Sequence, residues 1–429
     1  MFDLFPIILL FILAAGVRWV EIPHSEFAPT FYLGFILLTA YFLGRLGTRF
    51  RLPKISGYIL AGILFGPHVF NLLGHAEIEK LRLIDGLALA LIALIAGGEL
   101  KMDDIRKQLR SILSVLVFQV VIVFVGIALV VLLSHRILPV TRNLEFNTVV
   151  IVAIFLGVTA VAKSPATTIA IINEYRARGP MTDLVLGVTI LKDVVVLLIF
   201  AMVMSVAKML AHPGQSFDVS FLMKLITEIG LSLIIGAGLG GVFIFYLKRV
   251  RSETEVFLLL SVLLVAEFAP LFHLDALLLC IAAGFVVQNF SQQGQRFIEA
   301  IERSVLPVLV LFFAIAGAGL DLDALFNLWE FALILVLLRL GFTWIGTYLG
   351  IRVVKGHRAI EKYGWTGFVA QAGVTLGMAI LIERAFPDWG EELKTLIIAA
   401  ITVNQVIGPV LFRYGLYKAR ETAEFRKYD

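Results

Sequence analysis

Long apolar stretches alternate with short polar loops along almost the whole chain. Each stretch is close to the ~20 residues that a helix needs to cross a bilayer. We identify fourteen of them, at 4–20, 31–48, 55–73, 84–100, 111–134, 147–173, 183–209, 221–247, 255–271, 273–290, 303–320, 327–352, 361–385 and 393–416. The strands of a membrane barrel would be shorter and would alternate polar with apolar positions. The pattern therefore predicts an all-α polytopic membrane protein with about fourteen transmembrane helices, whose main environmental partner is the lipid bilayer.

Composition supports this class. The chain has 429 residues, of which 60% are hydrophobic and 16% charged, and its mean hydropathy is +0.95. Such values exclude an ordinary soluble domain. The sequence shows no P-loop and no G-x-G-x-x-G fingerprint, so nucleotide-driven pumping is not expected. One cysteine, Cys280, excludes a disulfide framework and a thiolate metal site. We expect neither an enzyme nor a cofactor.

The positive residues fall in alternate loops. They follow the second, fourth, sixth, eighth, twelfth and last apolar segments, as at Arg45–Lys54, Lys101–Arg110, Arg176–Arg178, Lys248–Arg251, Arg352–Arg358 and Lys418–Lys427. By the positive-inside rule these loops are cytoplasmic, which places both termini there. The clustering is a topology signal and does not indicate nucleic acid. We interpret 4–20 as a retained extra helix, because it lacks the basic start and the cleavage site of a signal peptide.

Lys192 and Asp193 are adjacent and lie near the middle of the segment 183–209. A charge at the bilayer centre costs at least ~2.5–3.5 kcal/mol on insertion scales. Such residues usually mark an ion or proton pathway, and Asp193 is the candidate carrier. The alternative is a structural ion pair of Asp193 with Lys163 or Lys192.

Two segments have polar and small residues at their centres, which predicts broken helices. They read FLGVTAVAKSPATTIAII in 147–173 and GWTGFVAQAGVTLGMAIL in 361–385. The charge count makes them enter the membrane from opposite sides. Broken helices in corresponding places of two inverted halves are typical of a transporter site. Taken singly, each could instead be a proline kink or a small-residue packing seam.

The polar clusters of five segments have similar predicted depths. Their members near the segment midpoints are Thr159, Lys163, Ser164, Asp193, Arg339, Gln371, Gly373, Thr375, Asn404 and Gln405. Thr189 precedes Asp193 by four residues and shares its helix face. Carboxylate and hydroxyl oxygens suit a small hard cation. We therefore expect a monovalent cation and proton site at Asp193, with Thr189, Ser164 and Thr159 as further ligands.

Three motifs resemble the monovalent cation:proton antiporter superfamily, in its Kef-type branch. GYILAGILFGP (57–67) resembles the second conserved helix, and KSPATTIAIINEYRARGP with LGVTILKDVVVLLIF resembles the first broken helix and the carboxylate helix. GWTGFVAQAGVTLGMAIL resembles the second broken helix, and the resemblance covers about 31–416. It implies an inverted-repeat fold with two crossed discontinuous helices, thirteen core helices and one extra N-terminal helix, in the inner membrane of a prokaryote.

The resemblance also implies an elevator mechanism and a homodimer. A scaffold of 31–83 and 210–302 would carry the dimer contact, and a core of 84–209 and 303–416 would move. Residues 1–30 and 417–429 would form the added helix and a short cytoplasmic tail. Kef-type members often carry a nucleotide-binding domain, so such gating here would need a separate cytoplasmic regulatory subunit.

The basic residue Arg339 matches the family's intramembrane Lys or Arg, which balances the charge of the site. Two lysines depart from the pattern. Lys163 replaces a Thr that often helps to ligate the cation, and Lys192 stands where many charge-moving members have Asp and many neutral exchangers have Asn. Either lysine could take part in proton handling or serve as a fixed structural charge, as Lys163 would by compensating half-helix dipoles.

We predict exchange of Na⁺ or K⁺ for H⁺, with Asp193 as the shared site. Two other readings stay open: proton-coupled transport of a small anion, and a channel or sensor subunit with a soluble regulator. The sequence leaves open the preferred ion and whether one or two protons move per cation.

Overall fold

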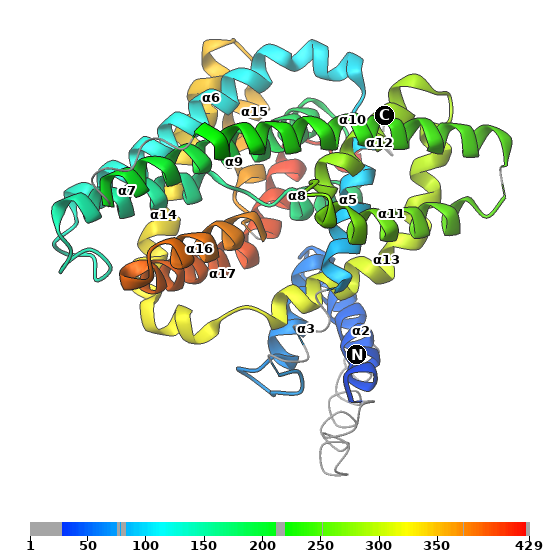
Figure 1. Ribbon diagram of the computed structural model, residues 1–429. Helices are drawn as coiled ribbons and strands as arrows, with labels where there is room; N and C mark the ends of the chain where they lie inside the picture. Colours follow the sequence, from blue (N-terminus) through cyan, green and yellow to red (C-terminus); the bar gives the residue numbers. More distant parts are fainter. Residues whose placement is uncertain are drawn as a thin grey trace. The chain divides into compact units, whose positions relative to one another are not determined.

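The computed structural model describes residues 28–74, 78, 83–211, 219–250, 252–371 and 373–425, and every regular element in them is helical. Figure 1 follows these helices along the chain from α2 in blue to α17 in red. The chain divides into two compact units, each made of two separate stretches. Unit 1 is Met1–Glu99 with Ser232–Asp321, and unit 2 is Leu100–Leu231 with Leu322–Asp429.

Unit 1 is a helical bundle in which α13 packs against α2, α3 and α5, while α12 packs against α5. Its helices are α2 (Ala28–Arg49), α3 (Lys54–Phe65), α5 (Leu83–Glu99), the later part of α10 (Val219–Arg249), α11 (Thr254–Leu271), α12 (Ala276–Phe290) and α13 (Gly294–Ala318). This bundle contains the motif 57–67, which begins in α3.

Glycines let α3 and α13 of unit 1 approach closely. A Cβ added at Gly62 of α3 would lie 1.9 Å from the carbonyl oxygen of Ala314, and one at Gly317 of α13 would lie 2.1 Å from that of Ile59. Reciprocal small residues are the usual way for membrane helices to gain van der Waals contact, because lipid is as apolar as their side chains. Gly62 and Gly66 of the motif 57–67 thus serve packing between α3 and α13, whereas Gly57 packs against Gly44 of α2.

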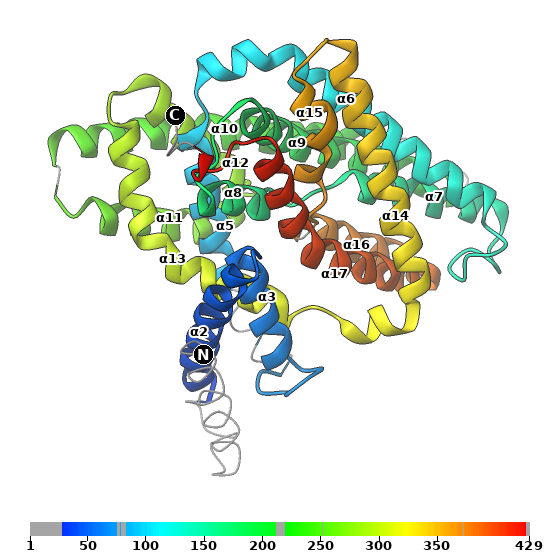
Figure 2. The same cartoon turned by 180° about the vertical axis from the view of Figure 1, so that it is seen from behind.

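Unit 2 is built around the long helix α6, which packs against α7, α9 and α14. A second group forms where α17 packs against α14, α16 and η2, and Figure 2 shows α16 and α17 side by side. Its elements are α6 (Met102–Leu133), α7 (Phe146–Val161), α8 (Pro165–Glu174), α9 (Pro180–Ala211), α14 (Leu322–Val353), α15 (Arg358–Tyr363), the 3₁₀ helix η2 (Gly364–Phe368), α16 (Gly373–Ala385) and α17 (Pro387–Lys418).

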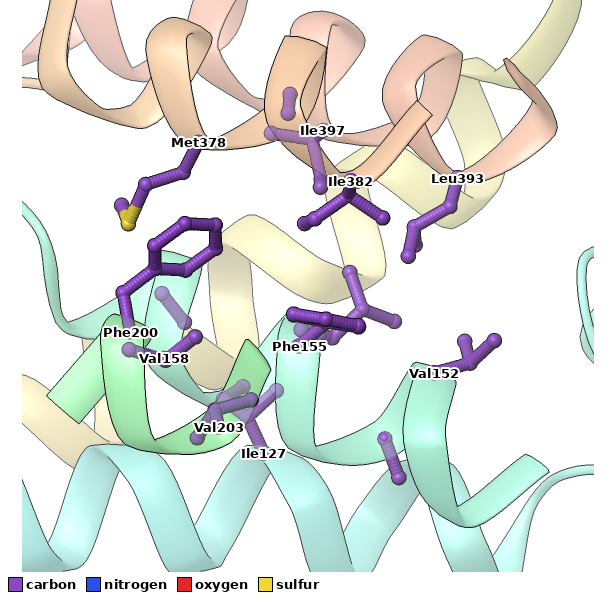
Figure 3. Packing of buried hydrophobic residues seen from close by; sticks show 14 of the residues in the cluster. Ile127, Val152, Phe155, Val158, Phe200, Val203, Met378, Ile382, Leu393 and Ile397 are labelled. Atoms are coloured by element: carbon purple, nitrogen blue, oxygen red, sulfur yellow. The ribbon is translucent and has the colours of Figure 1, made fainter. Parts of the chain in front are cut away.

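The apolar core of unit 2 lies between these two groups of helices. In Figure 3 side chains from α7 and α9 face side chains from α16 and α17. Phe155 of α7 is fully buried, and its ring lies 6.0 Å from that of Phe200 in α9 and 5.7 Å from that of Phe386, which precedes α17. Aromatic pairs at these separations add to the stability gained from burial. The core therefore joins α7, which precedes the first interruption, to α16 and α17, which follow the second interruption.

The apolar pattern located the helices well. Each predicted segment from 31–48 onward overlaps a helix or an interrupted helix, although in 55–73 the helix α3 ends at Phe65. The segment 4–20 lies outside the described residues. By length and composition, seven of the described helices could cross a membrane, or eight if Gly294–Ile301 and Val305–Ala318 form one bent span. Three further apolar helices, Lys54–Phe65, Gly86–Glu99 and Ala276–Phe290, are shorter. The number of fourteen spans stays a prediction.

The compact units do not share the boundaries of the predicted scaffold and core. They divide after Glu99, Leu231 and Asp321, whereas the predicted domains divide after 83, 209 and 302. The helix pairs α5–α12 and α3–α13 pack closely within unit 1, which explains why α5 and α13 belong to it. The division into a static and a mobile part stays a prediction.

Candidate functional site

The first interruption separates α7 from α8. Helix α7 ends at Val161, Ala162 and Ser164 have extended backbone, and α8 starts at Pro165. Proline has no N–H to continue α7, and it disfavours helical backbone in the residue before it. At the first position of a new helix it is well tolerated. The Ser164 hydroxyl accepts a hydrogen bond from the Thr167 N–H at 3.2 Å and so caps α8.

The second interruption lies between η2 and α16, and it is bonded to the first. Helix η2 ends at Phe368, and α16 begins at Gly373. The Ser164 N–H donates to the Ala370 carbonyl at 2.8 Å. Two segments more than two hundred residues apart in sequence thus meet through a direct main-chain hydrogen bond.

Arg339 of α14 holds carbonyl oxygens from both interruptions. Its guanidinium donates to the carbonyls of Ala160 (2.7 Å) and Ala162 (2.9 Å) at the end of α7. It also donates to those of Phe368 (3.1 Å) and Val369 (2.7 Å) at the end of η2. The last carbonyls of a helix have no partner within that helix and carry partial negative charge. A fully buried guanidinium therefore satisfies the ends of both half-helices at once.

Gln371 and Asn404 extend this network to α17. The Gln371 side-chain NH₂ donates to the carbonyls of Thr159 (2.9 Å) and Ala162 (3.2 Å). Its carbonyl then accepts from the Asn404 side-chain NH₂ at 2.8 Å. A cavity of about 10 Å³ adjoins the network and is lined by Thr159, Arg339, Gln371, Thr375 and Asn404 together with apolar side chains. Its volume is on the order of that of a single water molecule.

Lys163 lies inside the first interruption, on the side that faces α9. Its ammonium donates to the Thr189 hydroxyl of α9 and to the Gly367 carbonyl of η2, the latter at 3.1 Å. The Thr189 hydroxyl in turn donates to the Val185 carbonyl of its own helix. Asp193 is partly exposed and close enough to interact electrostatically with Lys163. Lys163 thus connects both interruptions to the carboxylate helix.

Lys192 lies one turn after Thr189 on α9 and bonds to a different helix, α6. Its ammonium donates to the Gln119 side-chain carbonyl of α6 at 2.6 Å. The Gln119 NH₂ then donates to the Thr347 hydroxyl of α14 at 2.6 Å. The Phe368 ring lies near both lysines, with its centroid 5.0 Å from the Lys163 ammonium and 5.5 Å from that of Lys192. Attraction to the aromatic face stabilises both buried cations.

The structure brings most of the predicted site residues together. The predicted clusters from five segments meet through the bonds of Lys163, Arg339, Gln371 and Asn404. Thr375 and Thr159 line the small cavity, and the Thr159 hydroxyl donates to the Phe155 carbonyl at 2.9 Å. The hydroxyl of Ser164 caps α8, Gly373 is the first residue of α16, and Gln405 is buried in α17. That Asp193, Thr189, Ser164 and Thr159 bind an ion stays a prediction.

Three contributors were not identified from the sequence: Gln119, Thr347 and Phe368. Gln119 interrupts the apolar run of 111–134, and Thr347 follows Arg339 by eight residues on the same helix face. These two positions carried a usable signal. Phe368 carried none, because an aromatic residue in an apolar segment is ordinary.

Comparison with known proteins agrees with this geometry. Residues 34–414 match the family described as sodium/hydrogen exchanger, transmembrane. The Na(+)/H(+)-K(+) antiporter GerN of Bacillus cereus is 22% identical over 91% of this chain and 96% of its own length. The Probable Na(+)/H(+) antiporter 3 of Methanocaldococcus jannaschii is 21% identical over 90% and 96%. A solved structure of the sodium proton antiporter MjNhaP1 from the same archaeon has a TM-score of 0.68 at 14% identity, over 92% of this chain and 98% of that one.

These similarities support the wider family but not the Kef-type branch. The relatives are described as Na⁺/H⁺ or Na⁺/H⁺-K⁺ antiporters, and the structural likeness is to MjNhaP1. Of the motifs that suggested the branch, one lies in α3, where glycines pack against neighbouring helices. The others lie at the interruptions and the carboxylate helix, where the architecture of the fold constrains the sequence. Such motifs identify the family more readily than a branch of it.

We predict that Arg339 is a principal determinant of stability. Arg339→Met removes the guanidinium donor from four carbonyls, of which, among the described residues, Ala162 alone keeps another, from Gln371. The change should cost about 3–5 kcal/mol. Arg339→Lys keeps the charge but not the planar fork, and should cost about 1–3 kcal/mol. Unfolding in detergent, followed by tryptophan fluorescence, measures both. Arg352→Lys, at the solvent-exposed end of the same helix, is the matched control, and equal midpoints for all variants would contradict the assignment.

A double-mutant cycle tests the contact between Lys192 and Gln119. Gln119→Leu removes the acceptor of a buried ammonium and should destabilise strongly, whereas Lys192→Met with Gln119→Leu replaces both partners by apolar groups. The coupling energy should be about 1.5–3 kcal/mol, as for hydrogen bonds to charged groups. Strictly additive unfolding energies would show that Lys192 does not make this bond in solution.

Proposed function

Because the chain belongs to the sodium/hydrogen exchanger family, we propose that it is a secondary transporter that exchanges Na⁺ for H⁺, with Asp193 as the shared binding site. The observation that carries this proposal is the junction of two interrupted helices beside a partly exposed carboxylate. Interrupted helices supply free main-chain groups within the membrane. The carboxylate supplies the negative charge for which a metal ion and a proton compete.

Lys163 is proposed to act as a tethered cation beside Asp193. When Asp193 is ionised and no Na⁺ is bound, the Lys163 ammonium interacts electrostatically with the carboxylate and balances its charge. A bound Na⁺ brings a second positive charge, and the repulsion between two unit charges at 4 Å is about 4 kcal/mol at an effective dielectric constant of 20. Na⁺ therefore has to displace the Lys163 ammonium or its proton. In the proton-carrying state Asp193 itself is protonated, and Na⁺ binding releases this proton. If the displaced Lys163 ammonium keeps its proton, one H⁺ moves per Na⁺; if Lys163 also loses its proton, two H⁺ move.

Lys192 is proposed to have a structural role. Its ammonium is held by Gln119 on the face of α9 that packs against α6. This contact accounts for the buried charge without a part in ion exchange. The position before the carboxylate would then contribute to helix packing rather than to the number of protons that move.

Unit 2 is proposed to be the mobile part of an elevator mechanism. All the residues of the junction belong to this unit, and their hydrogen bonds join α7, α9, α14, η2 and α17. A site contained in one compact unit can change its exposure by movement of that unit as a rigid body. The homodimer and the separate regulatory subunit remain expectations of the family resemblance.

Contacts within unit 2 support the predicted topology. The Ala423 N–H donates to the Tyr175 carbonyl at 3.1 Å, so the basic loop after α8 and the basic segment after α17 lie at the same end of the unit. The same end contains a hollow lined by Lys107, Pro180 and His357 from three other regions. We propose that this end faces the cytoplasm of a prokaryotic cell.

The anion alternative receives less support from the geometry. An excess of positive charge would favour an anion if the donors pointed into free space. Instead the donors of Lys163, Lys192 and Arg339 bond to neutral oxygens of the protein. Lys163 and Arg339 thereby hold the interruptions together, and Lys192 joins α9 to α6.

The transport proposal predicts that Asp193→Asn abolishes activity. Purified protein in liposomes should dissipate a preformed pH gradient when Na⁺ is added, and the variant should lose this response at least about tenfold, because a neutral amide neither attracts Na⁺ nor releases a proton. Addition of K⁺, Li⁺ and choline in turn identifies the ions accepted. Asp388→Asn removes an exposed carboxylate in α17 and should leave the rate unchanged. A full response in Asp193→Asn, or none to any cation in the native protein, would overturn the proposal.

Lys163→Met should improve the apparent affinity for Na⁺. Without the tethered charge the apparent KM should fall by about threefold to tenfold, and the exchange rate should not depend on an imposed membrane potential. Lys163→Arg keeps the charge and should retain the high KM. A membrane potential drives exchange only if net charge moves, as with two protons per Na⁺. If the potential changes the rate of the native protein and of Lys163→Met equally, the second proton does not come from Lys163.

A further inference from the structure

Glu421 caps the helix that carries Asp193. One oxygen of its carboxylate accepts the Met181 N–H at 2.7 Å, and the other accepts the N–H and the hydroxyl of Thr182, each at 2.7 Å. The side chain is 7% exposed. The first N–H groups of a helix have no acceptor within it, and the helix dipole favours a negative charge at this end. Since Pro180 has no N–H, Glu421 accepts both donors of the first turn.

The main chain around Glu421 is bonded to the loop between α8 and α9. The Arg178 N–H donates to the Glu421 carbonyl at 3.0 Å, next to the bond from Ala423 to Tyr175. Gly179 has a φ of +148°, and a Cβ at this position would lie 2.5 Å from the Glu421 carboxyl carbon. Only glycine fits both the backbone angle and the space. The loop is therefore shaped to receive this segment.

This cap differs from the others in unit 2. Ser164 caps α8 and His357 caps α15 from the positions directly before each helix, whereas Glu421 comes from a segment 239 residues away from Thr182. It joins the end of α8, the start of α9 and the segment after α17, which lie together in Figure 2. A local cap stabilises one helix, but this one fixes the positions of three.

Helix α9 is continuous from Pro180 to Ala211, so a shift of its first turn along the axis moves all of it. Thr189 follows Thr182 by seven residues, about 10.5 Å along the helix, and accepts the bond from Lys163. Whether Thr189 and Asp193 lie level with Lys163 depends on the axial position of α9. The other two helices held by the cap bring Ser164 and Asn404 to the junction.

We propose that Glu421 is a positioning residue for ion exchange, which sets the axial position of α9 and thereby the distance between Asp193 and Lys163. The proposal rests on the function proposed above. Glu421 touches neither ion, and its effect is transmitted through the rigid helix. Loss of the cap should weaken ion binding while the chemistry of Asp193 and the movement of the unit continue.

Hydrogen exchange and transport together test this role. In Glu421→Gln, the Met181 and Thr182 amides should exchange faster than in the native protein, because an amide side chain is a weaker acceptor than a carboxylate. The apparent KM for Na⁺ should rise by about threefold to tenfold, with the maximal rate per folded protein within about twofold. Glu421→Asp should restore part of both effects. Glu424→Gln changes an exposed carboxylate of the same segment and should alter neither.

Each result has a distinct meaning. Unchanged exchange at Met181 and Thr182 in Glu421→Gln would show that the cap does not form, and would overturn the inference without touching the function. Faster exchange with an unchanged KM would reduce Glu421 to a structural cap and would also overturn it. A native protein without any Na⁺ response would overturn the proposed function and the positioning role together, and would be recognised before any variant is made.

Discussion

The main-chain carbonyls of the interrupted helices are the constraint on which the rest of unit 2 depends. Water is scarce inside a membrane, so each exposed carbonyl needs a donor from the protein. The ends of α7 and η2 present such carbonyls at the same place, and Arg339, Gln371 and Lys163 supply the donors. Helix α14 has to run beside both interruptions because it carries Arg339. The packing of α14 against α6 and α17 follows from this requirement.

The same solution creates an electrostatic conflict that suits an exchanger. Three buried basic side chains surround a junction beside one partly exposed carboxylate, Asp193. Neutral oxygens accept the hydrogen bonds of these basic side chains, but they carry no negative charge to compensate a positive one. A further cation entering the site therefore meets repulsion, and it can stay only if positive charge leaves. Under the function proposed above, the coupling between the two ions would be a consequence of how the helix breaks are stabilised.

Much of this could be predicted from the sequence, because membrane insertion imposes strict local rules. The positions of the helices follow from apolar length, and the Pro165 break follows from the chemistry of proline. The clustering of Asp193, Arg339 and Gln371 followed from their similar depths. Depth could not show the direction of a side chain around a helix, so the neighbours Lys192 and Asp193 were treated as one pair although their side chains have different partners. Nor could local patterns reveal Glu421, whose partners lie 239 and 240 residues away.

The bond between Ser164 and Ala370 involves main-chain atoms alone. Replacement of a side chain nearby leaves its donor and its acceptor in place. The join between the two interruptions can therefore persist while the residues around it diverge, and the resemblance gives one instance, since Lys163 stands where a threonine is often found. Point substitutions around the junction can in this way change the ion preference and the charge balance of an exchanger. The main-chain bond that holds the two broken helices together stays the same.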